Sequence, residues 1–179
     1  MTAALVAALV CLPDAVKEAV PMKALVVYDS VFGNTEQVAL AIGNSLGAKE
    51  DVAVLRVTDV KPERLNDLTL LIVGSPTQKF RPTKAIVEFL GSIPANSLRG
   101  VGVSAFDTRI SAAHVNSRFL RTLMRVFRYA AGTIARKLQK KGGSLTIPPE
   151  GFIVENSEGP LKEGELERAA EWAKHLCRS

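Results

Sequence analysis

Short apolar runs alternate with helical patterns along most of this chain, and this alternation is the feature that most restricts its fold. Several of the runs are nearly uninterrupted Val, Ile, Leu and Ala, as expected for strands buried on both faces. The expected strands are Ala24–Tyr28, Val52–Val57, Leu68–Val73, Val101–Phe106, and a last one around Leu145–Ile147 and Phe152–Val154. The helical patterns between them are Glu36–Leu46, Thr83–Leu90, Leu120–Leu138 and Glu165–Leu176.

Strands that alternate with helices predict an α/β fold, with a parallel sheet covered on both faces. The 179 residues correspond to about one domain. We expect that domain to comprise residues 22–179, because "MKALVVY" reads as a first strand. Residues 1–21 read as an N-terminal extension, which either reflects a start codon assigned too early or adds an amphipathic turn. Its apolar run of about ten residues is too short for a spanning helix, which needs roughly 20.

Charge and cysteine content narrow the classes of partner and compartment. The formal net charge is +5 and the sequence pI is about 9.4, which points to an acidic partner, an anionic membrane or nucleic acid. Cys11 and Cys177 lie near opposite ends with no CxxC spacing, so the sequence predicts a reducing, cytoplasmic environment. His114 and His175 have no neighbours at ligand spacing, and we expect no metal site.

Ligands of such sheets bind beyond the carboxyl ends of the strands, where the strand order reverses. The stretch "YDSVFGNTEQVA" leaves the first strand and turns at once into a helix. Its hydroxyls and its amide, the freedom of Gly33 and the positive end of the helix dipole suit an anion. The absence of Lys and Arg, and of the GxGxxG spacing, favours a terminal monophosphate over a polyphosphate or dinucleotide. An ordinary helix N-terminus is the alternative.

Two further stretches, "VGSPTQKFRPTKAIVEFL" and "VSAFDTR", leave the third and fourth strands in the same way. Together with the first stretch and the tail "GPLKEGELERAAEWAKHL", they resemble the flavodoxin family over residues 22–179. The resemblance implies a flavodoxin-like three-layer sandwich with a five-stranded parallel sheet in the order 2-1-3-4-5. It also implies non-covalently bound FMN.

The resemblance assigns site residues by position. Those that would hold the phosphate are Ser30, Phe32, Gly33, Asn34 and Thr35. Those beside one part of the flavin are Thr77, Gln78, Lys79 and Phe80, and those beside another are Phe106, Asp107, Thr108 and Arg109.

Departures from the family pattern leave alternatives open. Phe32 stands where small flavodoxins commonly have a hydroxyl residue, and neither flavin stretch contains a Trp or Tyr. Phe80 or Phe106 would then stack on the flavin, or else anchor its loop to the core. Lys79 and Arg109 would stabilise the reduced, anionic flavin, or else be solvated surface charges.

The segment between "FDTR" and "KKGG" is longer than in a minimal flavodoxin. It carries a basic stripe at helical spacing, formed by Arg118, Arg121, Arg125 and Arg128. The stripe is either a solvated helix face or a docking surface for an acidic redox partner or an anionic membrane. Nucleic acid is disfavoured, because no base-reading module accompanies the charge.

The sequence therefore predicts an FMN-binding electron-transfer protein with no catalytic acid or base. One alternative is an oxidoreductase of the NAD(P)H:quinone or protoporphyrinogen-oxidising type on the same fold. Another is a flavodoxin-like interaction module without FMN.

Overall fold

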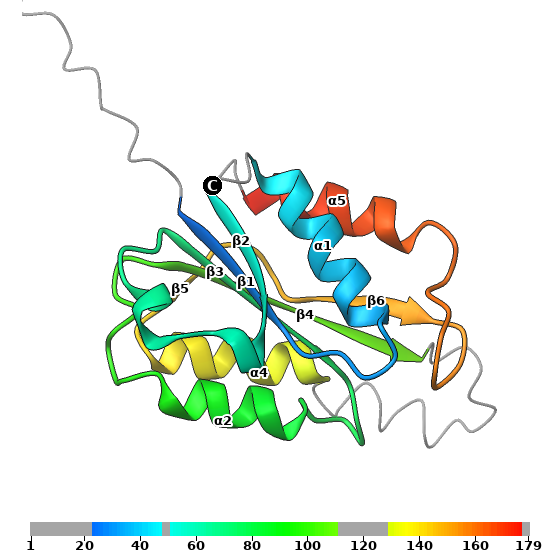
Figure 1. The fold of residues 1–179 in the computed structure, drawn as a ribbon, viewed down its shortest axis with the longest axis horizontal. Coiled ribbons are helices and arrows are strands. Elements are labelled where there is room, and N and C mark those ends of the chain that lie inside the picture. Colours follow the sequence, from blue (N-terminus) through cyan, green and yellow to red (C-terminus); the bar gives the residue numbers. More distant parts are fainter. Residues whose placement is uncertain (1–22, 48–50, 111–128, 177–179) are drawn as a thin grey trace, which may run out of the picture.

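A computed structural model describes residues 23–47, 51–110 and 129–176 of the chain (Figure 1). Strands and helices alternate along it, with two short 3₁₀ turns, Val57–Asp59 and Pro62–Leu65, after the second strand. The strands are β1 Ala24–Tyr28, β2 Val52–Arg56, β3 Leu70–Pro76, β4 Gly102–Ile110, β5 Ser144–Leu145 and β6 Glu150–Val154. The helices are α1 Asn34–Leu46, α2 Lys84–Ser92, α4 Ala130–Lys140 and α5 Glu165–Leu176. Within these ranges no helix combines the length and apolarity needed to cross a bilayer.

The strands form one parallel sheet in the order β2-β1-β3-β4-β5, which confirms the predicted fold class and strand order. β1 is central, with Val26 beside Val54 of β2 on one edge and Ile72 of β3 on the other. β1 is buried throughout, whereas β2 at the sheet edge is only partly buried. The order reverses between β1 and β3, so the carboxyl ends of these strands flank the expected binding position.

The fifth position of the sheet is occupied by two segments, so the sheet contains one strand more than the expected five. β5 pairs with β4 at Gly102 and Val103, and β6 pairs with β4 from Phe106 to Ile110. Pro148 and Pro149 lie between the two segments. Proline has no N–H to donate to a ladder, so the pairing is interrupted there and resumes at Glu150.

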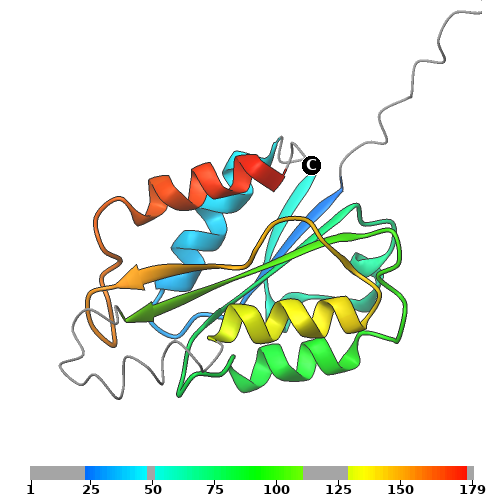
Figure 2. The ribbon, with the colours of Figure 1, turned by 180° about the vertical axis from the view of Figure 1, so that it is seen from behind.

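Two helices cover each face of the sheet, α1 and α5 on one and α2 and α4 on the other (Figures 1 and 2). Successive side chains of β1 alternate between the two cores. Leu25 packs with the residues of α2 and α4, and Val26 packs with those of α1 and α5. This alternation is the period-2 pattern of a strand buried on both faces.

Two boundaries differ from the sequence expectation and affect the site. β4 continues to Ile110 instead of ending at Phe106, because it pairs with β3 on one edge and β6 on the other. The expected single helix Leu120–Leu138 is wrong at Tyr129, which is non-helical with φ −53° and ψ 171° and precedes α4. Residues 120–128 of that expectation lie outside the described residues.

Candidate functional site

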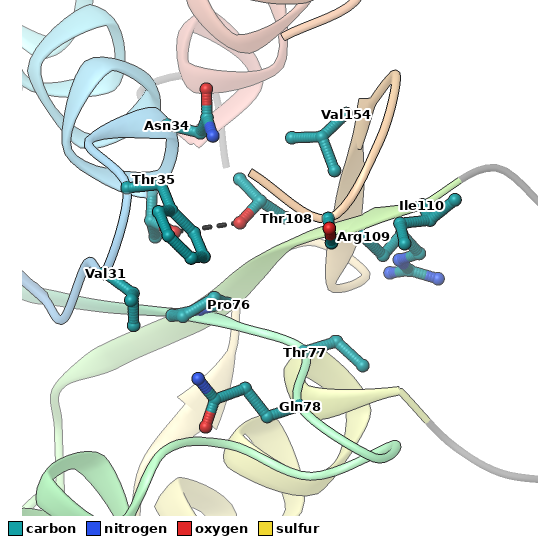
Figure 3. Close-up of a pocket in the computed structure, with 12 residues that line it drawn as sticks. Val31, Asn34, Thr35, Pro76, Thr77, Gln78, Thr108, Arg109, Ile110 and Val154 are labelled. Atoms are coloured by element: carbon teal, nitrogen blue, oxygen red, sulfur yellow. Dashed lines mark hydrogen bonds between the residues drawn. The ribbon is translucent and has the colours of Figure 1, made fainter. Parts of the chain in front are cut away.

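A pocket of about 270 Å³ lies where the carboxyl ends of β1, β3 and β4 meet (Figure 3). All three stretches singled out in the sequence contribute to it, as the parallel sheet requires. Most of the residues that line it are either apolar or polar without a charge. They are Val31, Phe32, Asn34, Thr35, Pro76, Thr77, Gln78, Thr108, Arg109, Ile110, Val154 and Ser157.

The loop after β1 is held in place by hydrogen bonds from its own residues and from β2. The Ser30 amide donates to the Asp29 carboxylate at 2.9 Å, and the Arg56 guanidinium donates to the Ser30 carbonyl. Arg56 also pairs with Asp29 at 3.7 Å. These contacts tie the start of the loop to the ends of β1 and β2.

Gly33 ends this loop with φ +84°, a left-handed conformation that non-glycine residues adopt only with strain. It precedes α1, whose first turn receives no side-chain capping hydrogen bond. The first amides of a helix have no partner within the helix, and together with its dipole they attract anions. The start of α1 is therefore open to an anionic ligand.

Ser30 gives an independent sign of a ligand at this loop. Its side chain is buried at 4% exposure, and among the described residues its hydroxyl has no hydrogen-bond partner. Leaving a buried hydroxyl unpaired costs about 1–3 kcal/mol. Neither Ser30 nor Gly33 is among the residues that line the pocket, although both belong to the loop at its edge. A bound group that accepts a hydrogen bond from the Ser30 hydroxyl would remove that cost.

Asn34 and Thr35 begin α1, and both are buried at the pocket wall. The Asn34 side-chain amide donates to the Glu158 carbonyl at 2.8 Å, which joins the first loop to the loop after β6. The hydroxyls of Thr35 and Thr108 lie 2.8 Å apart in a hydrogen bond across the pocket floor (Figure 3).

The stretch after β3 forms a tight turn. Gln78 and Arg81 exchange two backbone hydrogen bonds of 2.9 Å, and Lys79 and Phe80 between them both have positive φ, 46° and 65°. Two consecutive left-handed residues are the signature of a type I′ turn. Such conformations cost about 1–3 kcal/mol each in non-glycine residues, and they cluster at functional sites.

The turn divides the four expected residues of this stretch. Thr77 and Gln78 line the pocket, whereas Lys79 and Phe80 do not. The Phe80 ring instead packs against Tyr129, with the ring centroids 6.3 Å apart. The reading in which Phe80 anchors its loop fits this contact better than stacking on a ligand.

The expected residues 106–109 lie within β4, so their side chains alternate between its two faces. Thr108 and Arg109 line the pocket. Phe106 does not, because it is fully buried and packs edge-on against Phe152 at 6.1 Å in the core. The expectation that its ring lies beside the ligand is therefore not supported by its position, and we leave Phe106 out of the proposed site.

Asp107 points to the α4 side of the sheet and is also fully buried. Its carboxylate accepts hydrogen bonds from Arg109 Nε at 2.5 Å and from the Ala131 amide in the first turn of α4 at 2.8 Å. Burial raises the pKa of Asp107 above its ordinary value, although the Arg109 guanidinium opposes the shift. Asp107 is thus a structural partner of Arg109 and α4, and it does not line the pocket.

Two residues of the site were not anticipated from the sequence. Arg56 reaches the first loop because β2 pairs with β1 and places Arg56 beside Tyr28. The expected strand order could therefore have indicated this contact. Tyr129 lies within the segment expected to be helical, and no local pattern marks it. Its ring lies under the Arg109 guanidinium, with 3.8 Å between Cζ and the ring centroid.

The described residues contain no cluster of three or more His, Cys, Asp or Glu that could hold a metal ion.

The fold and pocket define a class of protein: doubly wound parallel α/β domains with a helix N-terminus at the strand-order reversal that is open to an anionic ligand. The family model described as Flavodoxin matches residues 26–172, and the chain belongs to the flavodoxin family. That family is flavin-binding, typically with FMN, and its members suggest a function of the electron-transfer type.

Solved structures agree with this assignment at the level of fold. A flavodoxin from the domain Archaea is 23% identical with a TM-score of 0.67, over 88% of this chain and 97% of that one. Flavodoxin 2 from Bacillus cereus is 22% identical with a TM-score of 0.68, over 87% and 98%. The rubredoxin oxygen:oxidoreductase of Desulfovibrio gigas is 18% identical with a TM-score of 0.64, over 87% of this chain and 35% of that one. A comparison with curated protein sequences gave no match.

Proposed function

We propose that this protein binds FMN in the pocket at the carboxyl ends of β1, β3 and β4 and transfers electrons. The observation that carries the proposal is the unpartnered, buried Ser30 hydroxyl beside a helix start without a side-chain cap. Both features belong to the same loop, and both suit a phosphate.

The residues of the first loop would hold the phosphate of FMN. Ser30 and Thr35 carry hydroxyls that can donate to phosphate oxygens, and the amides at the start of α1 add further donors. Gly33 keeps the backbone in the left-handed turn that exposes these amides. Thr77, Gln78, Thr108 and Arg109 line the part of the pocket that would contact the flavin ring.

The pocket lining favours electron transfer over acid–base chemistry. Among the described residues that line the pocket, Arg109 is the charged one. Its guanidinium stays protonated at ordinary pH, so it cannot act as a general acid or base. FMN supplies two accessible one-electron steps when bound, so electron transfer itself requires no protein acid or base. No observation favours the NAD(P)H:quinone or protoporphyrinogen type of oxidoreductase over this reading.

An FMN-free interaction module is the other alternative. A protein that had lost its cofactor would be expected to fill or close the pocket. Phe32, the residue that departs from the family pattern, lies at the pocket with 55% of its surface exposed and therefore does not fill it. Its exposure supports retention of the ligand site.

For the partner we propose an acidic redox protein, with an anionic membrane surface as the other candidate. The proposal rests on the net charge of +5 and on the stripe of Arg118, Arg121, Arg125 and Arg128, which lie outside the described residues. Rim charges of this kind act mainly on the association rate. We place the protein in the cytoplasm on the cysteine pattern alone.

The absorption spectrum of the purified protein, with and without added FMN, tests the cofactor assignment. A flavin spectrum perturbed by the protein supports it, and a spectrum identical to free FMN at every protein concentration contradicts it. Stopped-flow mixing with NAD(P)H then separates carrier from enzyme. We expect slow direct reduction, and fast reduction would favour the oxidoreductase.

A further inference from the structure

Another hollow lies between α4 and the segment that leads from β5 to β6, at the edge of the sheet (Figure 2). We call it the α4 groove, and its volume is about 380 Å³. Its apolar walls are formed by Tyr129, Ala131, Ala135, Leu145 and Pro149, and Leu145 remains 37% exposed. An apolar side chain from another molecule would lose contact with water in such a hollow, which favours binding.

The helix that borders the α4 groove is basic. Residues 129–149 contain four Lys and Arg and no Asp or Glu. Arg136 is exposed and lines the groove, and Lys140 follows one turn later on the same side of α4. Arg136 donates to the Gly132 carbonyl of its own helix at 3.2 Å. Among the described residues, no carboxylate forms an ion pair with Arg136, Lys137 or Lys140.

The carboxylates closest to the groove in the fold are paired with other cations. Asp107 is fully buried and pairs with Arg109, so this pair adds little net charge to the groove, although Arg109 lines it. Glu150 follows Pro149 in the chain, but its carboxylate pairs with Arg168 of α5 at 3.2 Å. The net charge beside the groove is therefore positive, and it comes from α4.

We propose that the α4 groove is a docking site for an acidic segment of a partner protein, which places an apolar side chain in the groove and carboxylates beside Arg136 and Lys140. Arg109 lines both the groove and the pocket proposed for FMN, so a partner docked here lies next to that pocket. The assignment of this partner to electron transfer rests on the proposed function. Complementary charges of this kind raise the association rate and fix the register of the two surfaces.

The construction of the groove favours a protein over a membrane or a nucleic acid. Its apolar side chains line a hollow, whereas a membrane-binding helix presents an apolar face that enters the bilayer. Single-stranded nucleic acids stack their bases on open aromatic faces. Tyr129 is the aromatic residue of the groove lining, and the Arg109 guanidinium covers its ring at 3.8 Å. Phe80 packs against the same ring.

A short peptide of Glu and Gly with one central Phe is the probe for this site. We expect it to bind the full-length protein at low salt and to shift the NMR signals of α4 and Leu145. A matched peptide with Ser in place of Phe should bind about tenfold more weakly, because it buries no apolar side chain. Added salt should weaken the binding of both peptides, since it screens the charges of α4.

The double variant Arg136→Gln and Lys140→Gln tests the charge beside the groove. We expect the affinity for the Phe peptide to fall about three- to tenfold, as for the loss of two exposed ion pairs. The matched control is Lys61→Gln with Arg64→Gln. It removes two exposed cations from the turn after β2, which is the opposite edge strand of the sheet, and should leave the affinity unchanged.

Leu145→Ser tests the apolar wall of the groove. It should weaken binding of the Phe peptide and leave that of the Ser peptide unchanged, because only the first peptide contacts this wall. Thermal melts establish that each variant is folded. Equal weakening in the α4 double variant and in its control would show a general charge effect and overturn the inference.

Three further results would also overturn it. They are no binding of the Phe peptide, shifted signals away from the groove, and α4 signals that shift with anionic vesicles or single-stranded DNA but not with the peptide. FMN titration of the same protein is a separate measurement. Peptide binding at the groove without FMN binding would overturn the proposed function alone, and FMN binding without peptide binding at the groove would overturn the inference alone.

Discussion

The hydroxyl oxygens of Thr35 and Thr108 lie 2.8 Å apart in a buried hydrogen bond, although 73 positions separate the two residues in the chain. The bond joins the first turn of α1 to the end of β4. It therefore fixes the loop proposed to hold phosphate relative to the strand that carries Arg109. The two functional parts of the pocket are positioned by the fold and not by the ligand.

Ser30→Ala should weaken FMN binding without destabilising the apoprotein. Removal of an unpartnered buried hydroxyl should leave the apoprotein as stable as the wild type or slightly more stable, because no hydrogen bond is lost. FMN affinity should fall about 10- to 100-fold, since a hydrogen bond to a charged group is worth about 1.5–3 kcal/mol. Thermal melts and FMN titration measure the two effects. An apoprotein clearly destabilised by the change, with unaltered affinity, would show that Ser30 has a structural role only.

Gly33→Val should abolish or strongly weaken FMN binding. The left-handed backbone at φ +84° disfavours any side chain, and the cost is about 1–2 kcal/mol even though a Cβ meets no atom within 4 Å. The added side chain would stand where the backbone and the phosphate must approach. Gly91→Ala in α2 is the matched control, because its Cβ also meets nothing and its φ is not positive. We expect the control to bind FMN normally, and unchanged FMN affinity in a folded Gly33→Val protein would remove the phosphate assignment.

Asp107 should give the free energy of unfolding an unusual pH dependence. Burial raises its pKa in the folded protein above the ordinary value of 3.8, so between these two values the folded state binds more protons than the unfolded state. The contribution of Asp107 to stability should therefore decrease as the pH rises through that window. Urea unfolding of the wild type and Asp107→Asn, at a series of pH values from 3.5 upward, measures it. The free energy of unfolding of the wild type should decrease relative to that of Asp107→Asn as the pH rises. A difference between the two proteins that stays constant or increases with pH would contradict the raised pKa of Asp107.

The arginine stripe should act on docking and not on cofactor binding. Changing Arg121, Arg125 and Arg128 to Gln should leave FMN affinity intact and slow electron transfer to an acidic partner, or reduce binding to anionic vesicles. The effect should shrink with added salt, because the Debye length falls from about 10 Å at 0.1 M to about 3 Å at 1 M. If both electron transfer and vesicle binding are unchanged at low salt, the stripe is a solvated helix face.

The strands and the loops of the site could be predicted from the sequence, because buried parallel strands and the Ser30–Thr35 loop leave strong local patterns, whereas the strand order was implied by the family resemblance. The orientation of residues 106–109 could not be predicted in this way. That depends on where β4 ends, and the pairing with β6 extends the strand beyond Phe106. Phe106 and Thr108 lie two positions apart on β4 and therefore face the same side of the sheet, where Phe106 packs in the core and Thr108, nearer the carboxyl end of the strand, lies at the pocket.

The start of α4 shows a second limit of sequence reasoning. The helical pattern of Leu120–Leu138 predicts an uninterrupted helix, but α4 begins at Ala130. Its first amides are bound by distant side chains, Ala130 by the Thr77 hydroxyl and Ala131 by the Asp107 carboxylate. A helix boundary set by such tertiary contacts has no signature in the neighbouring sequence. The contacts of Arg109 with Asp107 and Tyr129 could not be predicted from the sequence for the same reason.

Titration of the apoprotein with FMN and with riboflavin tests the central claim most directly, because the two ligands share the flavin ring and differ in the phosphate. If the Ser30–Thr35 loop holds that phosphate, FMN should bind at least 100-fold more tightly than riboflavin, and the advantage should shrink in Ser30→Ala. Equal affinities for the two ligands, or no binding of FMN, would contradict the account.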